Sequence, residues 1–201
     1  GNAGDWSTTR TFAVYSEILR PDGVGSETNI DSQEPDSGEH WEKVDEVTPD
    51  DTSTFVWIAG SAGTWRRDLY NIENHSEGSG VINKITVHFR VQRYQYNQAA
   101  EAEGCIRTHG TTYDGDEQSI SGYEVWYDFT QEWENNPYTG RPWIWEEIDN
   151  LEIGVRLQNH IFVTTSRVRC TQIYVVVDYT PYTLPPTKPV LYSLSLIHIS
   201  E

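Results

Sequence analysis

The chain has 201 residues, which is enough for one β-sandwich domain with a substantial core. Its 31 acidic residues against 14 basic ones give a formal net charge of −17. A surface this negative repels phosphate backbones and anionic lipid, which argues against nucleic acid and membrane as partners. Its 8 Trp and 12 Tyr, with no Met, favour strands over helices. No apolar run approaches the roughly 20 residues that cross a bilayer.

The first half of the chain predicts short strands separated by turns rich in Gly, Asp and Ser. A long loop is expected over residues 21–39. The clearest strand runs from 81 to 94, because apolar Ile85, Val87 and Phe89 alternate with polar residues. Earlier strands are expected at residues 11–19, 40–44, 54–58 and 66–72.

The second half predicts a polar loop at 95–103, then a hairpin over 105–115 with a Gly-bearing turn. A short capping helix is expected at about 143–150, because Trp145, Ile148 and Leu151 recur at a spacing of three. Further strands are predicted at residues 123–129, 151–157 and 167–179.

About nine strands and one short helix favour an all-β fold over alternating βαβ units. We predict an antiparallel jelly-roll-like β-sandwich, with an immunoglobulin-like sandwich as the alternative. The module spans residues 11–180, after an N-terminal fragment end at 1–10. A Pro-rich linker at 181–189 follows, and 190–201 is interpreted as a truncated next segment.

Residues 194–201 resemble the in-frame translation of a sequencing adapter, so we interpret them as an artefact tail on a fragment of environmental origin. Cys105 and Cys170 both lie in strand-like sequence. They form either a disulfide, which requires an oxidising compartment, or two buried free thiols. Their spacing matches no metal motif.

Several short motifs between residues 19 and 180 resemble β-sandwich modules of phage and prophage structural proteins and of prokaryotic secreted or surface proteins. The resemblance implies no catalytic residues, and Ile144 departs from the Thr or Ser usual at the start of the helix. The motifs are Leu19-Arg20-Pro21, Val44-Asp45-Glu46, Arg107-Thr108, Asn136-Pro137, Pro142-Trp143, Ile148-Asp149, Arg167-Val168 and Asp178-Tyr179.

No nucleophile motif, paired histidine ligands or Gly-rich phosphate loop is present, so the chain is expected not to be an enzyme. A glycoside hydrolase is the alternative, since such enzymes use two carboxylates across a cleft. In a chain with 31 acidic residues, clusters arise by composition alone, and a solvated acidic face is the favoured interpretation. These are Glu132 and Glu134, then Glu146, Glu147, Asp149 and Glu152.

Structural calcium is the candidate cofactor, because hard cations prefer converging carboxylate and carbonyl oxygens. Asp45, Asp50 and Asp51 share one turn with Glu46, and Asp178 ends the last strand. The strict spacing of a calcium loop is missing. Alternatively, Asp50 and Asp51 hydrogen-bond only their own turn.

Aromatic rings at turn edges are candidate platforms for sugars, since Trp and Tyr combine an apolar face with a polar edge. The candidates are Trp65, Trp133, Tyr138 and Trp143, for which packing of the helix onto the sandwich is the competing role. Trp57, Trp126 and Trp145 lie in periodic segments and are expected in the core.

The sequence thus predicts a non-enzymatic structural or adhesion module of a phage virion or tail, or of a prokaryotic surface protein. A carbohydrate-binding module of a secreted multidomain protein is the alternative. Expected partners are other modules or subunits of the same assembly, and possible glycans. The expected location is extracellular, on the cell surface or in a virion.

Overall fold

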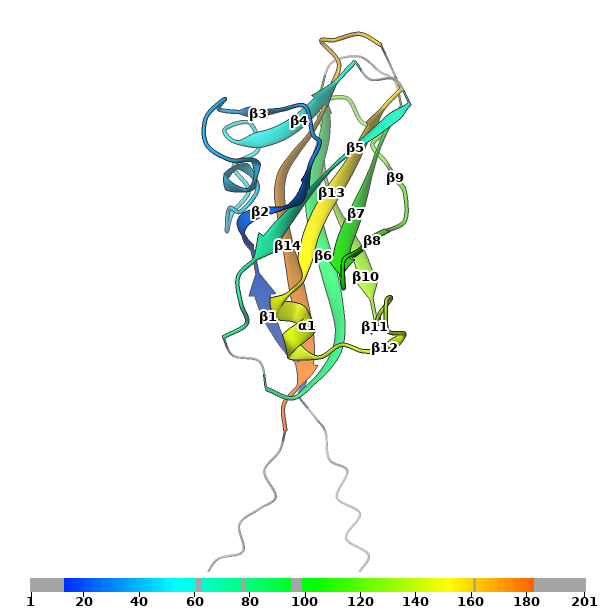
Figure 1. Cartoon of the computed structure of the whole chain (residues 1–201). Coiled ribbons are helices and arrows are strands. Elements are labelled where there is room, and N and C mark those ends of the chain that lie inside the picture. The colour runs from blue at the N-terminus through cyan, green and yellow to red at the C-terminus, as the bar shows by residue number, and fades with distance from the viewer. Residues whose placement is uncertain (1–12, 61–62, 77–78, 95–98, 161, 183–201) are drawn as a thin grey trace, which may run out of the picture.

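The computed structural model describes residues 13–60, 63–76, 79–94, 99–160 and 162–182. Within these ranges the chain forms two antiparallel sheets that face each other as a β-sandwich, as predicted. Figure 1 shows the strands β13, β7 and β8 in front of the longer strands β14 and β6. The N-terminal end, the Pro-rich linker beyond residue 182 and the adapter-like tail lie outside the described residues.

The first sheet, which we call sheet A, is centred on two strands of 14 residues, β6 (Val81–Tyr94) and β14 (Arg167–Thr180). The edge strand β10 (Trp126–Trp133) pairs with β6. On its other side, β14 pairs with both β1 and β4, and β4 pairs in turn with β3. These three strands are β1 (Tyr15–Leu19), β3 (Ser32–Glu34) and β4 (Phe55–Ala59).

The second sheet, sheet B, contains β13 (Glu152–Asn159) and β7 (Ala100–Thr108), with β8 (Thr111–Asp114) and β9 (Gln118–Ser119) paired to β7. The pair β2 (Pro21–Thr28) and β5 (Thr64–Ile72) belongs to the same sheet. It lies against β13, where the Gly63 N–H donates to the Asn159 carbonyl. A two-residue pair, β11 (Asn135–Asn136) and β12 (Arg141–Pro142), precedes the helix.

The core lies between the sheets and is made of the inward residues of their strands. In β6 the buried residues Ile85, Val87, Phe89 and Val91 alternate with more exposed polar ones, as the sequence predicts. In β13 nearly every residue is shielded, because the strand lies between β5 and β7 and packs against β14 of the facing sheet. The core is therefore continuous from β6 and β14 across to β7 and β13.

The capping helix is confirmed as α1 (Trp145–Asp149). Ile148 and Leu151 are buried and Trp145 packs against the core, so the predicted face does turn inward. The predicted strand at 40–44 is wrong: residues His40–Lys43 form the 3-10 helix η1. No helix within the described ranges is long and apolar enough to span a membrane.

The predicted loop at 21–39 is also wrong in part, because it contains β2 and β3. Both are poor in apolar residues and pair along strands whose own sequences are strongly patterned. Likewise, β7 begins at Ala100, inside the expected polar loop, where it pairs with β13. β10 is shifted by a few residues toward the C-terminus from the predicted 123–129.

Cys105 and Cys170 are free and buried, which decides between the two alternatives. Cys105 lies in sheet B and Cys170 in sheet A. Burial raises the pKa of the Cys105 thiol, and it raises the pKa of Cys170 to about 12. Both thiols are thus protonated and act as small apolar side chains.

Candidate functional site

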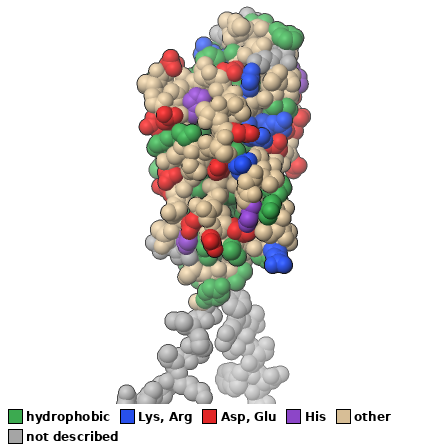
Figure 2. Space-filling view, viewed as in Figure 1, with side chains coloured by type: hydrophobic (Ala, Val, Ile, Leu, Met, Phe, Trp, Pro, Cys, Tyr) green, Lys and Arg blue, Asp and Glu red, His purple; other side chains and the backbone are tan. Residues whose placement is uncertain are grey.

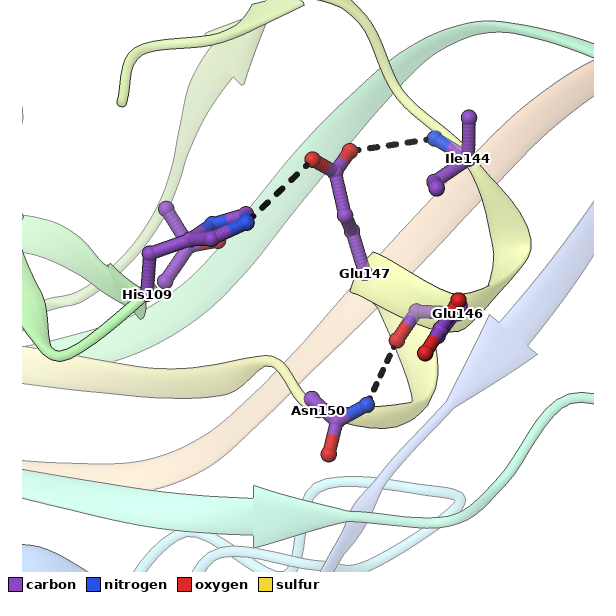
Figure 3. Close-up of a pocket in the computed structure, with 6 residues that line it drawn as sticks. His109, Ile144, Glu146, Glu147 and Asn150 are labelled. Carbon is purple, nitrogen blue, oxygen red and sulfur yellow. Dashed lines mark hydrogen bonds and ion pairs between the residues drawn. The ribbon is translucent and has the colours of Figure 1, made fainter. Parts of the chain in front are cut away.

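A hollow of about 320 Å³ lies between α1 and the turn that joins β7 to β8. Figure 3 shows the side chains of His109 and Glu147 turned toward each other across it. Its lining combines hydroxyl, imidazole, carboxylate and amide groups with one apolar side chain. The lining residues are Thr108, His109, Ile144, Glu146, Glu147 and Asn150. We call this hollow the α1 pocket.

The β7–β8 turn presents His109 to the pocket. His109 and Gly110 have φ values of 50° and 75°, the left-handed conformation that a tight hairpin turn requires. The turn is anchored from beneath by Asn136, which is buried and donates from Nδ2 to the Thr108 hydroxyl at 3.2 Å. Asn136 also accepts the Tyr138 N–H, so the same side chain fixes two sides of the site.

The helix side of the pocket is held by contacts that compensate for the missing cap at Ile144. The Glu147 carboxylate accepts the Ile144 N–H at 3.1 Å, as in the returning half of a capping box. Trp145 donates from Nε1 to the Gly80 carbonyl at 3.1 Å. Asp149 accepts the His75 N–H at 3.0 Å, which ties the helix to the segment after β5.

A second hollow of about 300 Å³ adjoins the α1 pocket and shares Ile144 and Glu147 with it. It is lined in addition by Thr139, Arg141 and Pro142. The two hollows together form an open surface groove over the start of the helix, with polar groups on both walls. Figure 2 shows acidic, basic and His side chains spread over the visible face, this end included.

Tyr138 gives the site an exposed aromatic ring. Its ring lies parallel to that of His109, with centroids 4.6 Å apart and an interplanar angle of 4°. Tyr138 is 54% exposed, so the ring pair meets solvent. The His109 Nε2 atom lies 3.7 Å from the Glu147 carboxylate, whose side chain is only 10% exposed. The site therefore combines a flat ring, hydrogen-bond donors and a carboxylate fixed by the helix backbone.

The other predicted sugar platforms are placed elsewhere. Trp143 is 2% exposed and donates from Nε1 to the Trp133 carbonyl, so its ring packs in the core and offers no face to a ligand. Trp133 is partly buried against the same core. Trp65 lies on sheet B with the Arg156 guanidinium 4.6 Å above its ring. Trp133 and Trp143 therefore pack against the core of the sandwich, which is the role that competes with sugar binding.

The residues that the prediction missed are His109, Asn150 and Arg141. The sequence contains one usable signal, because the predicted hairpin places the His109 imidazole at its turn, where a side chain meets solvent. Asn150 and Arg141 carry no such signal, since only the folded chain brings them to the groove.

The predicted calcium ligands do not converge on one point. Asp50 accepts from the Thr54 and Thr171 hydroxyls, whereas Asp51 pairs with the Arg90 guanidinium at 2.7 Å. Asp178 accepts from Ser16, seven residues along β14 from Thr171, which is about 23 Å in a strand. Asp45 stays near Glu46, and burial raises the pKa of both carboxyls.

Within the described residues, no group of three or more His, Cys, Asp or Glu side chains is arranged to hold a metal ion. A calcium site at the Asp45–Asp51 turn therefore stays a prediction. The turn is held instead by its own hydroxyl and backbone contacts, such as the Thr54 N–H donating to Asp50.

Comparison with known proteins gives no family assignment: no protein-family model matches the chain, and no curated protein does. The resemblance to phage and surface modules thus stays a prediction. Among solved structures, the chain is similar to several carbohydrate-binding modules.

One is the CBM22-1 xylan-binding domain of Paenibacillus barcinonensis Xyn10C, at a TM-score of 0.42 and 7% identity over 84% of this chain and 97% of that one. Another is CBM35 from Cellvibrio japonicus Abf62, at a TM-score of 0.38 and 10% identity. This match covers 84% of this chain and 99% of that one. A third is TmCBM61 in complex with β-1,4-galactotriose, at a TM-score of 0.35 and 12% identity. This match covers 61% of this chain and 70% of that one. With scores and identities this low, no residue role or ligand of this chain follows from the likeness.

Proposed function

We propose that the chain is a non-catalytic carbohydrate-binding module that takes a short stretch of glycan in the α1 pocket. The observation that carries the proposal is the exposed Tyr138–His109 ring pair beside the polar lining of a hollow of about 320 Å³. A pyranose presents apolar C–H groups on its faces and hydroxyls at its rim. A flat ring next to fixed donors and acceptors complements both.

The polar groups of the lining are of the kinds that hydrogen-bond sugar hydroxyls. Glu146 and Glu147 offer acceptors, Asn150 offers both donor and acceptor, and His109 offers a ring nitrogen. The Glu147 carboxylate is oriented by the Ile144 N–H before any ligand binds, which lowers the entropic cost of binding. A glycan ligand also implies a role outside the cell as one module of a longer protein.

The structural or adhesion module that the sequence first suggested has no comparable observation to support it in the described residues. A glycoside hydrolase is a weaker candidate, because the sequence has none of the common catalytic motifs. When the protein is incubated with an oligosaccharide that it binds, we expect no new reducing ends to form.

The test is a glycan array on the chain, followed by calorimetry with the best neutral oligosaccharide, in calcium and again in chelator. Tyr138→Ala is expected to weaken binding about tenfold, since a stacked ring contributes about 1 kcal/mol or more. Tyr123→Ala is the matched control, because Tyr123 is 51% exposed but, unlike Tyr138, does not stack on a residue that lines the pocket. A blank array, or equal affinity of the two variants, would contradict the proposal.

A further inference from the structure

The outer face of sheet A carries a row of large side chains at the end far from α1. Strand register places Trp126, Gln92, Arg169 and Trp57 side by side on β10, β6, β14 and β4. Their sequence neighbours, such as Val91 and the two residues flanking Arg169, are buried in the core. The row therefore points away from the core, which corrects the expectation that Trp57 and Trp126 are core residues.

Two arginines of this face are stacked on aromatic rings. The Arg167 guanidinium lies 4.1 Å from the centroid of the Trp57 ring. The Arg169 guanidinium lies 3.7 Å from the Tyr94 centroid and 4.4 Å from that of Phe55. Stacking fixes the plane of each guanidinium. Arg169 also hydrogen-bonds the Tyr94 side chain, so Arg167, which is only partly buried, is the arginine better placed to meet a partner.

Neither arginine has an acidic partner among the described residues, although the chain has a net charge of −17. Arg90 on the same face shows the usual arrangement, because it pairs with Asp51 and Asp128. Arg169 is 6% exposed, and burial, with the neighbouring Arg167, lowers its pKa. The Glu124 charge acts on Arg169 from a distance, but the two adjacent cations make no ion pair, and holding them in a folded protein is costly.

The same row contains polar atoms that are buried without a hydrogen-bond partner. They are Nε1 of Trp57, Oε1 of Gln92 and Nε of Arg169. Gln92 and Arg169 are both more than nine-tenths buried, so their polar groups are largely shielded from water. Buried polar atoms without a partner are uncommon in folded proteins, so these three atoms point to a missing binding partner. This observation does not depend on the stacking distances given above.

We propose that this arginine–aromatic row, made of Trp57, Gln92, Tyr94, Trp126, Arg167 and Arg169, binds a carboxylate-bearing sugar such as a uronate unit of an acidic polysaccharide. The guanidiniums take the carboxylate through paired N–H···O bonds. The indole and phenol rings take the pyranose face. Small side-chain rotations on docking bring the unpartnered Trp57 and Gln92 groups to the sugar hydroxyls.

A uronate suits the row better than a nucleic acid does. Each sugar ring brings a single charge together with an apolar face, whereas a phosphate backbone would extend over the acidic remainder of the surface. The site is separate from the α1 pocket. Trp145 bonds to the Gly80 carbonyl at the start of β6, and Tyr94 ends that strand about 40 Å away.

The experiment is calorimetry with oligogalacturonate and with its neutral methyl ester, at low and at raised salt. Arg167→Gln is the main variant, because Arg167 is only partly buried and its loss leaves the core intact. Lys84→Gln is the matched control: it removes the same charge from the same sheet, at the other end, where Lys84 pairs with Glu132. Folding of each variant is checked by circular dichroism.

We expect Arg167→Gln to weaken oligogalacturonate binding about tenfold or more, and Arg167→Lys to retain part of the affinity. Lys84→Gln is expected to bind as the parent does. Four outcomes would overturn the proposal: no binding by the parent at low salt, equal binding of the ester, equal losses in Arg167→Gln and Lys84→Gln, or equally tight binding of single-stranded DNA. Failure of the α1 pocket proposal would appear separately, with neutral glycans and Tyr138→Ala.

Discussion

Glu46 carries a carboxylate that the fold has partly removed from water. Its Oε1 accepts from the Thr54 hydroxyl, while Oε2 is buried without a partner. Burial is the largest cause that raises the pKa of Glu46, and the nearby charges of Asp50 and Asp45 add to it. The folded state therefore holds a proton at this position more tightly than the unfolded chain does.

We predict that Glu46→Gln stabilises the protein at neutral pH. In the parent, the ionised carboxylate costs stability above the raised pKa, and this cost disappears as the pH falls to the ordinary value near 4.5. The advantage of the variant should therefore be largest at pH 7 and shrink on acidification. Urea unfolding across this pH range checks it.

Glu117→Gln, at an exposed position, is the control and should change the urea midpoint little at any pH. A Glu46→Gln variant that is less stable than the parent at pH 7 would show that the carboxylate makes a favourable contact that the amide cannot replace.

At the scale of elements, β13 and β5 approach each other closely at Gly154. A Cβ atom at this position would lie 2.1 Å from the Asp68 carbonyl oxygen and 2.8 Å from the Leu69 side chain. The Asp68 carboxylate in turn is fully buried and accepts the Asn29 and Ile30 N–H groups, both at 2.8 Å. The β2–β5 pair is thus held to β13 by backbone that cannot easily move.

Gly154→Ala should destabilise the protein by about 3 kcal/mol, at the upper end for overpacking, because a backbone atom must shift to admit the methyl group. Gly23→Ala is the matched control in a strand of the same sheet, since the nearest atom to its added Cβ is 3.6 Å away. Its effect should stay within about 1 kcal/mol. Equal urea midpoints for the two variants would contradict this account of the contact.

The elements that the sequence predicted well are those whose own residues specify one buried face. β6, the C-terminal half of β14 and α1 show this property, either by alternation or by a spacing of three. The β7–β8 hairpin is predicted instead by its Gly-bearing turn, since β7 is buried along nearly its whole length. β2 and β3 were missed because their pairing is specified by the neighbouring strand. η1 was read as a strand because the four residues His40–Lys43 are too few to show a period.

At the scale of the whole molecule, the net charge of −17 sets how stability depends on salt. Repulsion among surface carboxylates favours the expanded chain and is screened at raised ionic strength. Exposed ion pairs such as Lys84–Glu132 lose attraction in salt as well, but pairs of this kind contribute little.

We therefore predict that the thermal midpoint rises when the NaCl concentration is raised from a low value to about 1 M. At this concentration the Debye length falls to about 3 Å, so repulsion between surface charges is screened. Differential scanning calorimetry checks it, with an equal osmolality of a neutral solute as control. A midpoint that falls with salt would show that attractive pairs outweigh the overall repulsion.

The amino-acid sequence by itself determined the class of fold, the position of the helix and the exclusion of the commonest catalytic motifs, because these depend on local period and on residue type. It also placed Tyr138 among the candidate ligand residues. Only the tertiary structure decided that Trp143 is buried, that His109 and Glu147 face each other, and that Arg167 and Arg169 lie against aromatic rings. These facts depend on strand register and on contacts between residues far apart in the chain, which no local pattern encodes.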